Sequence, residues 1–142
     1  MGQRFLIDTC TIIKYLDELL PSDAISFLDD LVDNDCKVSF ITKIELLVWN
    51  SPNSGDIIIR EELLAGSEIY YVNDAIINCA IEIRKKTNIK LPDAIIAATA
   101  ICNDFILLST NSNDFNKVIF LGLKYKNPED GFMMDTTNLK FN

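Results

Sequence analysis

The sequence contains no histidine at all. This absence excludes, from the chain itself, the Ser-His-Asp triad, the Cys-His pair, His-ligated zinc and acid–base chemistry by histidine. A hydrolase built on this chain must therefore work with carboxylates, with metal ions or with lysine.

The four cysteines are scattered, and no two of them show the C-x-x-C spacing of a zinc or redox site. We therefore interpret them as reduced thiols buried in the core: Cys10, Cys36, Cys79 and Cys102.

Long hydrophobic runs are also missing, although 49% of the residues are hydrophobic. Runs such as 94–98 and 105–108 are far shorter than the ~20 residues needed to cross a bilayer. Arg4 is followed directly by a strand-like run, without the apolar stretch and cleavage site of a secretory signal. We expect a soluble, cytoplasmic protein with no membrane association.

Positive charge is scarce, because 13 basic residues stand against 21 acidic ones and give a net charge of −8. This balance argues against a broad basic surface that binds nucleic acid non-specifically. It does not exclude a metal-dependent nuclease, since divalent ions neutralise clustered carboxylates, and an acidic surface suits a basic protein partner.

Strand-like apolar runs alternate with helical patterns along the chain. Strands are predicted over 4–7, 37–41, 68–72 and 105–109, and a fifth apolar segment covers 118–123. Helices are predicted between them, including one that begins at Thr42 and an almost wholly apolar one over 94–102 that should lie deep in the core. The pattern predicts an α/β fold whose central, mainly parallel sheet of about five strands is covered on both faces.

Four acidic residues fall where a functional crevice is expected in such a fold, beyond the carboxyl ends of the strands. Asp8 directly follows the first strand, and Glu45 lies in the first turn of the helix after the second. Asp93 opens the apolar helix, and Asp114 follows the fourth strand. We expect these side chains to converge at one edge of the sheet.

Each acid also has a purely structural interpretation. Thr42 and Glu45 fit a capping box, and Asp8 suits a helix N-cap. Asp93 suits the positive end of a helix, and Asp114 suits a turn. Taken together, however, unpaired carboxylates at buried strand ends are costly, and a hard divalent ion such as Mg²⁺ or Mn²⁺ would neutralise them.

Three segments resemble the acidic motifs of PIN domains, and in detail those of VapC-type toxins of bacterial toxin–antitoxin pairs. The most specific is KLPDAIIAATA over 90–100, and LIDTC over 6–10 and ITKIEL over 41–46 have the family's order and spacing. The resemblance spans about residues 4 to 125. It implies a PIN-like three-layer α/β/α sandwich, with a nuclease domain over 1–126 and a tail over 127–142 that we expect to be mobile.

The resemblance implies a Mg²⁺- or Mn²⁺-dependent endoribonuclease. Asp8 and Asp93 would be direct metal ligands, and Glu45 a ligand or a base acting through bound water. Asp114 would support these ligands or hold a second ion. Ser112 stands where the family often has an acid or Asn, so the sequence leaves both a one-metal and a two-metal site open.

Several further residues are candidates for contacts with RNA or water. Hydroxyls that could orient water or phosphate belong to Thr9, Thr110 and Ser112, and ordinary loop hydrogen bonding explains the last two equally well. The cations closest in sequence to the acidic motifs, which could also be ordinary solvated lysines, are Lys14, Lys43, Lys86 and Lys90.

The resemblance also implies a cognate antitoxin that covers the cleft, and a homodimer. Interface candidates near the N-terminus, which core packing explains equally well, are Ile12, Ile13 and Leu16. Two other functions stay open. One is a phosphoacceptor domain, although Cys10 breaks its D-x-D motif, and the other is a catalytically inactive PIN-like module that binds proteins.

Overall fold

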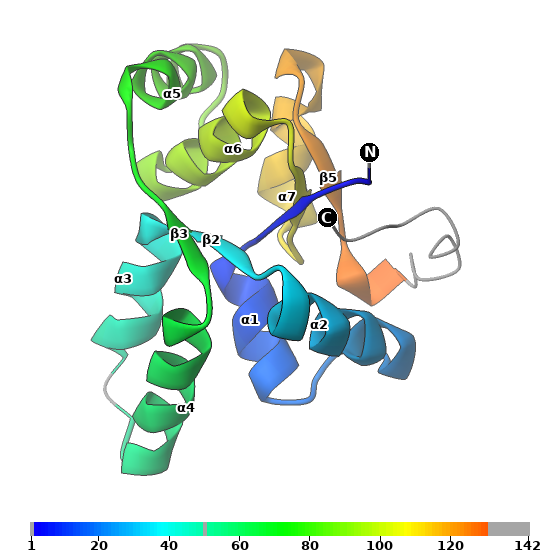
Figure 1. The fold of residues 1–142 in the computed structure, drawn as a ribbon. Coiled ribbons are helices and arrows are strands. Elements are labelled where there is room, and N and C mark those ends of the chain that lie inside the picture. The colour runs from blue at the N-terminus through cyan, green and yellow to red at the C-terminus, as the bar shows by residue number, and fades with distance from the viewer. Residues whose placement is uncertain (1, 50, 131–142) are drawn as a thin grey trace.

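The computed structural model describes residues 2–49 and 51–130, in which short strands alternate with helices (Figure 1). In chain order, the elements are β1 (Phe5–Ile7), α1 (Thr9–Leu16), α2 (Ser22–Asn34), β2 (Lys37–Ser39), α3 (Phe40–Val48), α4 (Ser54–Ala65), β3 (Glu68–Tyr70), α5 (Asp74–Lys86), α6 (Leu91–Asn103), β4 (Ile106–Leu108), α7 (Ser112–Phe115), the 3₁₀-helix η1 (Asn116–Leu121), β5 (Lys124–Lys126) and the 3₁₀-helix η2 (Pro128–Asp130).

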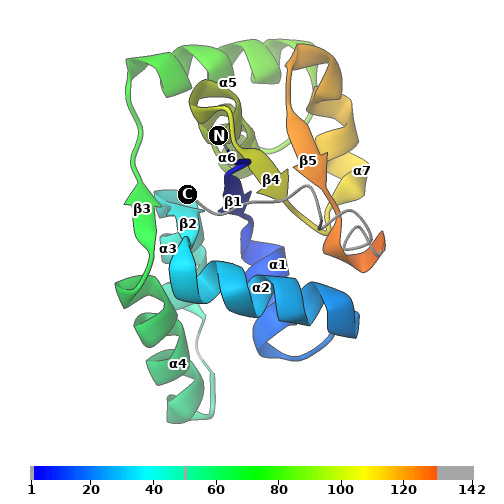
Figure 2. The same cartoon turned by 45° about the vertical axis from the view of Figure 1, so that its right-hand side comes forward.

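The described strands are all parallel and pair as two small sheets, one in the order β1-β4-β5 and one formed by β2 and β3. Strand β2 packs beside β1, so the two sheets continue each other in one layer (Figures 1 and 2). The predicted parallel sheet of about five strands is confirmed, with the hydrogen-bond ladder interrupted between β1 and β2.

Alternate residues of β1 and β4 face two separate cores, because successive side chains of a strand point to opposite faces. Phe5 and its neighbour in register Ile106 pack with residues of α1, α2, α3 and α4. Leu6 and Leu107 pack with α5, α6 and α7. Figure 2 shows α1 and α2 on one side of these strands and α5 and α6 on the other. The fold is therefore the predicted three-layer α/β/α sandwich.

Helix α6 lies in the core, as its sequence predicts. Ala94, Ala97 and Ala98 are fully buried, because small side chains let the helix approach the sheet and α5 closely. The prediction that all four cysteines lie in the core is wrong for Cys102, which is exposed near the end of this helix.

Two predicted boundaries are also wrong. Helix α3 begins at Phe40 and not at Thr42, because the Ser39 hydroxyl accepts the Ile41 N–H at 3.1 Å and caps the helix there. The apolar segment 118–123 contains most of η1, which ends at Gly122 with φ 103°, a conformation that glycine adopts without steric cost. The last strand is the more polar β5, which follows it.

The start of the predicted tail packs onto the domain. Pro128 is buried, and Lys14 Nζ lies 2.9 Å from Glu129 Oε2. The rest of that tail, residues 131–142, lies outside the described residues. Across residues 2–49 and 51–130, no helix has both the length and the apolarity that a membrane span requires.

Candidate active site

Asp8 stands at the carboxyl end of β1 and caps helix α1. Its Oδ1 accepts the Thr9 N–H at 2.9 Å, so the N-cap interpretation is correct. Its Oδ2 accepts the Ser109 hydroxyl at 2.8 Å and the Cys10 thiol at 3.1 Å. The residue is only 4% exposed. Strands β1 and β4, which pair side by side, thus bring Asp8 and Ser109 together at one edge of the sheet.

Burial raises the pKa of Asp8 above its ordinary value, and the charge of Glu45 acts in the same direction. The hydrogen bonds from Cys10, Ser109 and Thr9 oppose this rise because they favour the carboxylate. Burial and the neighbouring Asp8 charge also raise the pKa of the Cys10 thiol. Cys10 therefore stays protonated at neutral pH, where it supports Asp8 as a donor and is a poor nucleophile.

Glu45 reaches the same edge from helix α3 and is held by Thr9. The Thr9 hydroxyl donates to Glu45 Oε1 at 2.6 Å and lies 2.9 Å from the hydroxyl oxygen of Thr42. The capping-box interpretation of Glu45 is wrong, because the N-cap of α3 is Ser39. The Glu45 carboxylate instead bonds to a residue adjacent to Asp8.

Asp93 lies in the first turn of α6 and is partly buried. Its pKa is raised from 3.8 to about 6, mainly by burial and then, in decreasing order, by the charges of Asp8, Asp114 and Glu45. The Lys90 charge opposes them. Carboxylates influence one another strongly only at short range in a partly buried site, so Asp93 senses all three other predicted acids.

This raised pKa has a definite consequence for stability. The folded protein binds more protons than the unfolded chain between the unfolded value near 3.8 and the folded value of about 6. Stability therefore falls as the pH rises through this window, and the penalty is complete above it. At neutral pH the ionised cluster is electrostatically unfavourable, and a bound cation would relieve it.

Asp114 is positioned by the short helix α7. Its backbone N–H donates to Asn111 Oδ1 at 3.4 Å, and its Oδ2 accepts from Asn111 Nδ2 at 3.0 Å, so the turn interpretation is correct for its local structure. Its Oδ1 lies 3.7 Å from Lys117 Nζ. The fully buried Phe115 anchors this turn in the core.

The predicted loop hydroxyls mainly make structural contacts. Ser112 Oγ accepts from Asn127 Nδ2 at 2.9 Å, which ties α7 to the segment after β5. Thr110 forms a side-chain hydrogen bond with Cys10 that lowers the thiol pKa. Ser112 therefore holds the loop of Asp114 in place where the family often carries a further acid.

The lysines predicted to contact RNA have different surroundings. Lys90 is the N-cap residue of α6, and its charge lowers the Asp93 pKa. The remaining three are Lys14, which pairs with Glu129, Lys43, which is exposed, and Lys86, whose Nζ lies 3.5 Å from Glu82 Oε2.

Sequence reasoning missed Ser109 and Cys10, which donate to Asp8, and Thr42, which contacts the Thr9 hydroxyl. Ser109 carried a usable signal, because it directly follows a predicted strand, as Asp8 does. Cys10 and Thr42 carried none, since their roles depend on neighbours that the fold brings together.

The donor set fits a hydrated divalent cation. Among residues 2–49 and 51–130, no three acidic or thiol side chains are spaced to hold one metal ion together. A cage of three direct protein ligands is therefore not formed by these side chains as they stand. Mg²⁺ commonly keeps several waters and is held by only one or two carboxylates. This mode of binding suits acidic side chains that lie near one another but cannot all reach the same ion.

A comparison with known protein families identifies the family of this chain. The family model of the PIN domain matches residues 5–121. The chain belongs to the PIN domain family. All four clustered acids of this PIN domain fall within the matched residues. No protein with a curated description matches the chain.

Solved structures similar to this PIN domain come from toxin–antitoxin complexes. VapBC2 from Rickettsia felis bound to promoter DNA matches with a TM-score of 0.73 and 20% identity, covering 88% of this chain and 98% of that one. VapBC-1 from nontypeable Haemophilus influenzae gives 0.73 and 21%, with the same coverage. A toxin–antitoxin complex from Klebsiella pneumoniae gives 0.64 and 26%, covering 78% and 88%. At 20% and 21% identity, the first two similarities show only that the fold is shared.

Proposed function

We propose that this PIN domain hydrolyses RNA phosphodiester bonds with Mg²⁺ or Mn²⁺, as the toxin of a type II, VapBC-like toxin–antitoxin pair. The observation that carries the proposal is that Asp93 is partly buried near three other acids, so that burial and the charges of Asp8, Asp114 and Glu45 together raise its pKa to about 6. Perturbed acids that share a site are typical of catalytic centres.

Asp8 and Asp93 would hold the ion in this proposal. When bound, the ion would lower the pKa of a water molecule and neutralise charge on phosphate oxygens. Ser109 and Cys10 fix the orientation of Asp8 by donating to one of its oxygens. The ordering of this carboxylate before RNA arrives lowers the cost of assembling the site.

Glu45 would accept a proton from water. It is exposed, and the Thr9 hydroxyl donates to one of its oxygens, which leaves the other free to act. Asp114 would add negative charge to the cluster or hold a second ion, with Asn111 fixing its direction. The chemistry needs no histidine, which agrees with the composition of the chain.

An exposed apolar surface on α3 and α4 supports the proposed antitoxin partner. Large apolar side chains gathered on a surface mark sites of protein–protein contact. They are Ile44, Leu47, Val48, Trp49, Ile58 and Ile59. Ile12, in contrast, is fully buried, and Ile13 and Leu16 pack against the same core, so core packing accounts for these interface candidates.

The test is cleavage of RNA by the purified wild-type protein. We expect products from at least one of a panel of tRNA, ribosomal RNA and messenger RNA when Mg²⁺ or Mn²⁺ is present. Addition of EDTA should stop cleavage, and restored Mg²⁺ should recover it, because water activation depends on the ion. An intact panel in both metals, from a protein that still binds an antitoxin, would favour the inactive protein-binding module instead.

A further inference from the structure

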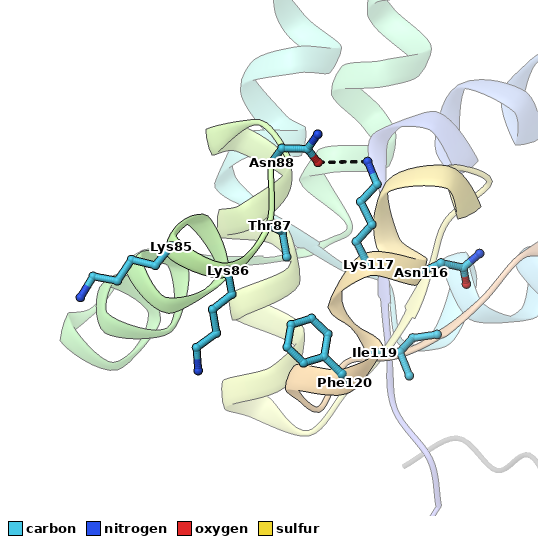
Figure 3. Close-up of a pocket in the computed structure, with 8 residues that line it drawn as sticks. All are labelled: Lys85, Lys86, Thr87, Asn88, Asn116, Lys117, Ile119 and Phe120. Carbon is cyan, nitrogen blue, oxygen red and sulfur yellow. Dashed lines mark hydrogen bonds between the residues drawn. The ribbon is translucent and has the colours of Figure 1, made fainter.

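A basic groove lies between the C-terminal end of α5 and η1 (Figure 3). It is a wide depression open to solvent, with a volume of about 1010 Å³, and Lys85, Lys86, Asn88, Asn116, Lys117 and Phe120 are among its lining residues. Three lysines line this one surface, although the net charge of the chain is −8. The groove therefore has a locally positive charge that attracts anionic ligands.

The ammonium groups of the groove remain available to a ligand. Lys85 and Lys86 lie 3.8 Å and 3.5 Å from the carboxylate oxygens of Glu82, and all three side chains are more than half exposed. Exposed pairs of this kind are weak because water screens them. A phosphate backbone can therefore compete with Glu82 for both lysines.

Phe120 adds an aromatic face to this charge. It is 68% exposed, whereas Phe105 and Phe115 are buried. Figure 3 shows its ring in the groove together with Lys86 and Thr87. An exposed ring beside lysines is the arrangement by which proteins bind single strands, since bases stack on the ring and phosphates meet the cations. A purely acidic peptide would gain nothing from the ring.

Lys117 links the groove to one acid of the candidate site. Lys117 Nζ donates to Asn88 Oδ1 at 3.0 Å and lies 3.7 Å from Asp114 Oδ1. Asn88 also belongs to the loop that leads into α6, whose first turn contains Asp93. Lys117 of η1 thus contacts both Asn88, on the other wall of the groove, and Asp114 of the candidate site.

We propose that the basic groove binds single-stranded RNA on one side of the bond to be cleaved, with Phe120 stacking on a base and Lys85 and Lys86 contacting phosphates. This inference rests on the proposed function, because it assigns the path of that function's substrate. Because a base must be unpaired to stack on Phe120, a duplex of equal length should bind more weakly than the single strand.

Fluorescence anisotropy with a labelled single-stranded RNA of about 12 nucleotides, in EDTA, measures this binding without cleavage. Phe120→Ala should weaken it on the order of tenfold, and Phe120→Trp should restore it. The double variant Lys85→Ala/Lys86→Ala should reduce the slope of log K against log salt by about 1.4, since each lost contact removes about 0.7. The matched control is Lys124→Ala, whose lysine pairs with Asp104 at the opposite edge of the sheet.

The results separate this inference from the proposed function. Unchanged binding by Phe120→Ala and by the double lysine variant, or equal binding of duplex RNA or polyglutamate without any effect of Phe120, overturns the groove as a single-strand site. Phe120-dependent binding by a wild-type protein that cleaves nothing upholds the groove and overturns the nuclease. Circular dichroism of each variant checks that it is folded.

Discussion

Asp93→Asn is expected to reduce metal-dependent RNA cleavage by about a hundredfold or more, because it removes a charge that holds the ion and balances charge in the transition state. The measurement is the initial rate on the RNA that the wild type cleaves best, at saturating Mg²⁺. The variant should remain folded, since asparagine has nearly the same shape as aspartate.

Asp104→Asn is the matched control for this variant. Asp104 is exposed and pairs with Lys124 at the other end of the sheet, so its loss should leave the rate unchanged. Without metal at neutral pH, Asp93→Asn should be at least as stable as the wild type, because it removes the cost of burying a charge and the repulsion by neighbouring acids, which together raise the Asp93 pKa. Cleavage within a few-fold of wild type would remove Asp93 from the metal site.

Phe115→Ala is expected to lower the free energy of unfolding by about 3–5 kcal/mol, the usual cost of deleting a fully buried phenylalanine. Phe115 is 0% exposed and packs in the core that α6 and β4 share. It also anchors the turn that carries Asp114, so its loss should loosen one side of the acidic cluster.

Urea denaturation of Phe115→Ala and Phe120→Ala gives the comparison, since the two rings lie on the same short stretch of chain. Phe120 is largely exposed, and its removal should change stability by no more than about 0.5 kcal/mol. Equal losses in the two variants would contradict the packing of this segment.

The positions of the acids were largely predictable from the sequence. Asp8 directly follows an apolar strand, which places it at the carboxyl edge of a parallel sheet. Asp93 opens the apolar helix α6, which leads into β4. Glu45 shows where local pattern fails. Its spacing from Thr42 imitates a capping box, but its carboxylate bonds to Thr9, a residue of another helix, and only the fold shows that contact.

The boundaries of two elements were not predictable for a related reason. The run over 37–41 consists mainly of strand-favouring residues, yet the hydroxyl of Ser39 ends the strand by capping α3. The polar segment Lys124–Lys126 forms the last strand because it pairs with β4. A local hydrophobic pattern cannot predict such a pairing.

The net charge of the chain does not predict the basic groove. The overall value of −8 argues against a broad basic surface, but a total says nothing of how the lysines are distributed over the surface. Lys86 and Lys117 are distant in sequence and line the same groove only because α5 and η1 face each other. Local charge, and not the total, decides where a substrate is held.

The carboxyl titration of Asp93, followed by ¹³C NMR with and without Mg²⁺, tests the shared cation most directly. Without metal, the pKa should be about 6, because of burial and the neighbouring charges of Asp8, Asp114 and Glu45. Added Mg²⁺ should lower it, since the cation favours the ionised form. A pKa near 3.8, or one that Mg²⁺ leaves unchanged, would contradict a cation held by these carboxylates.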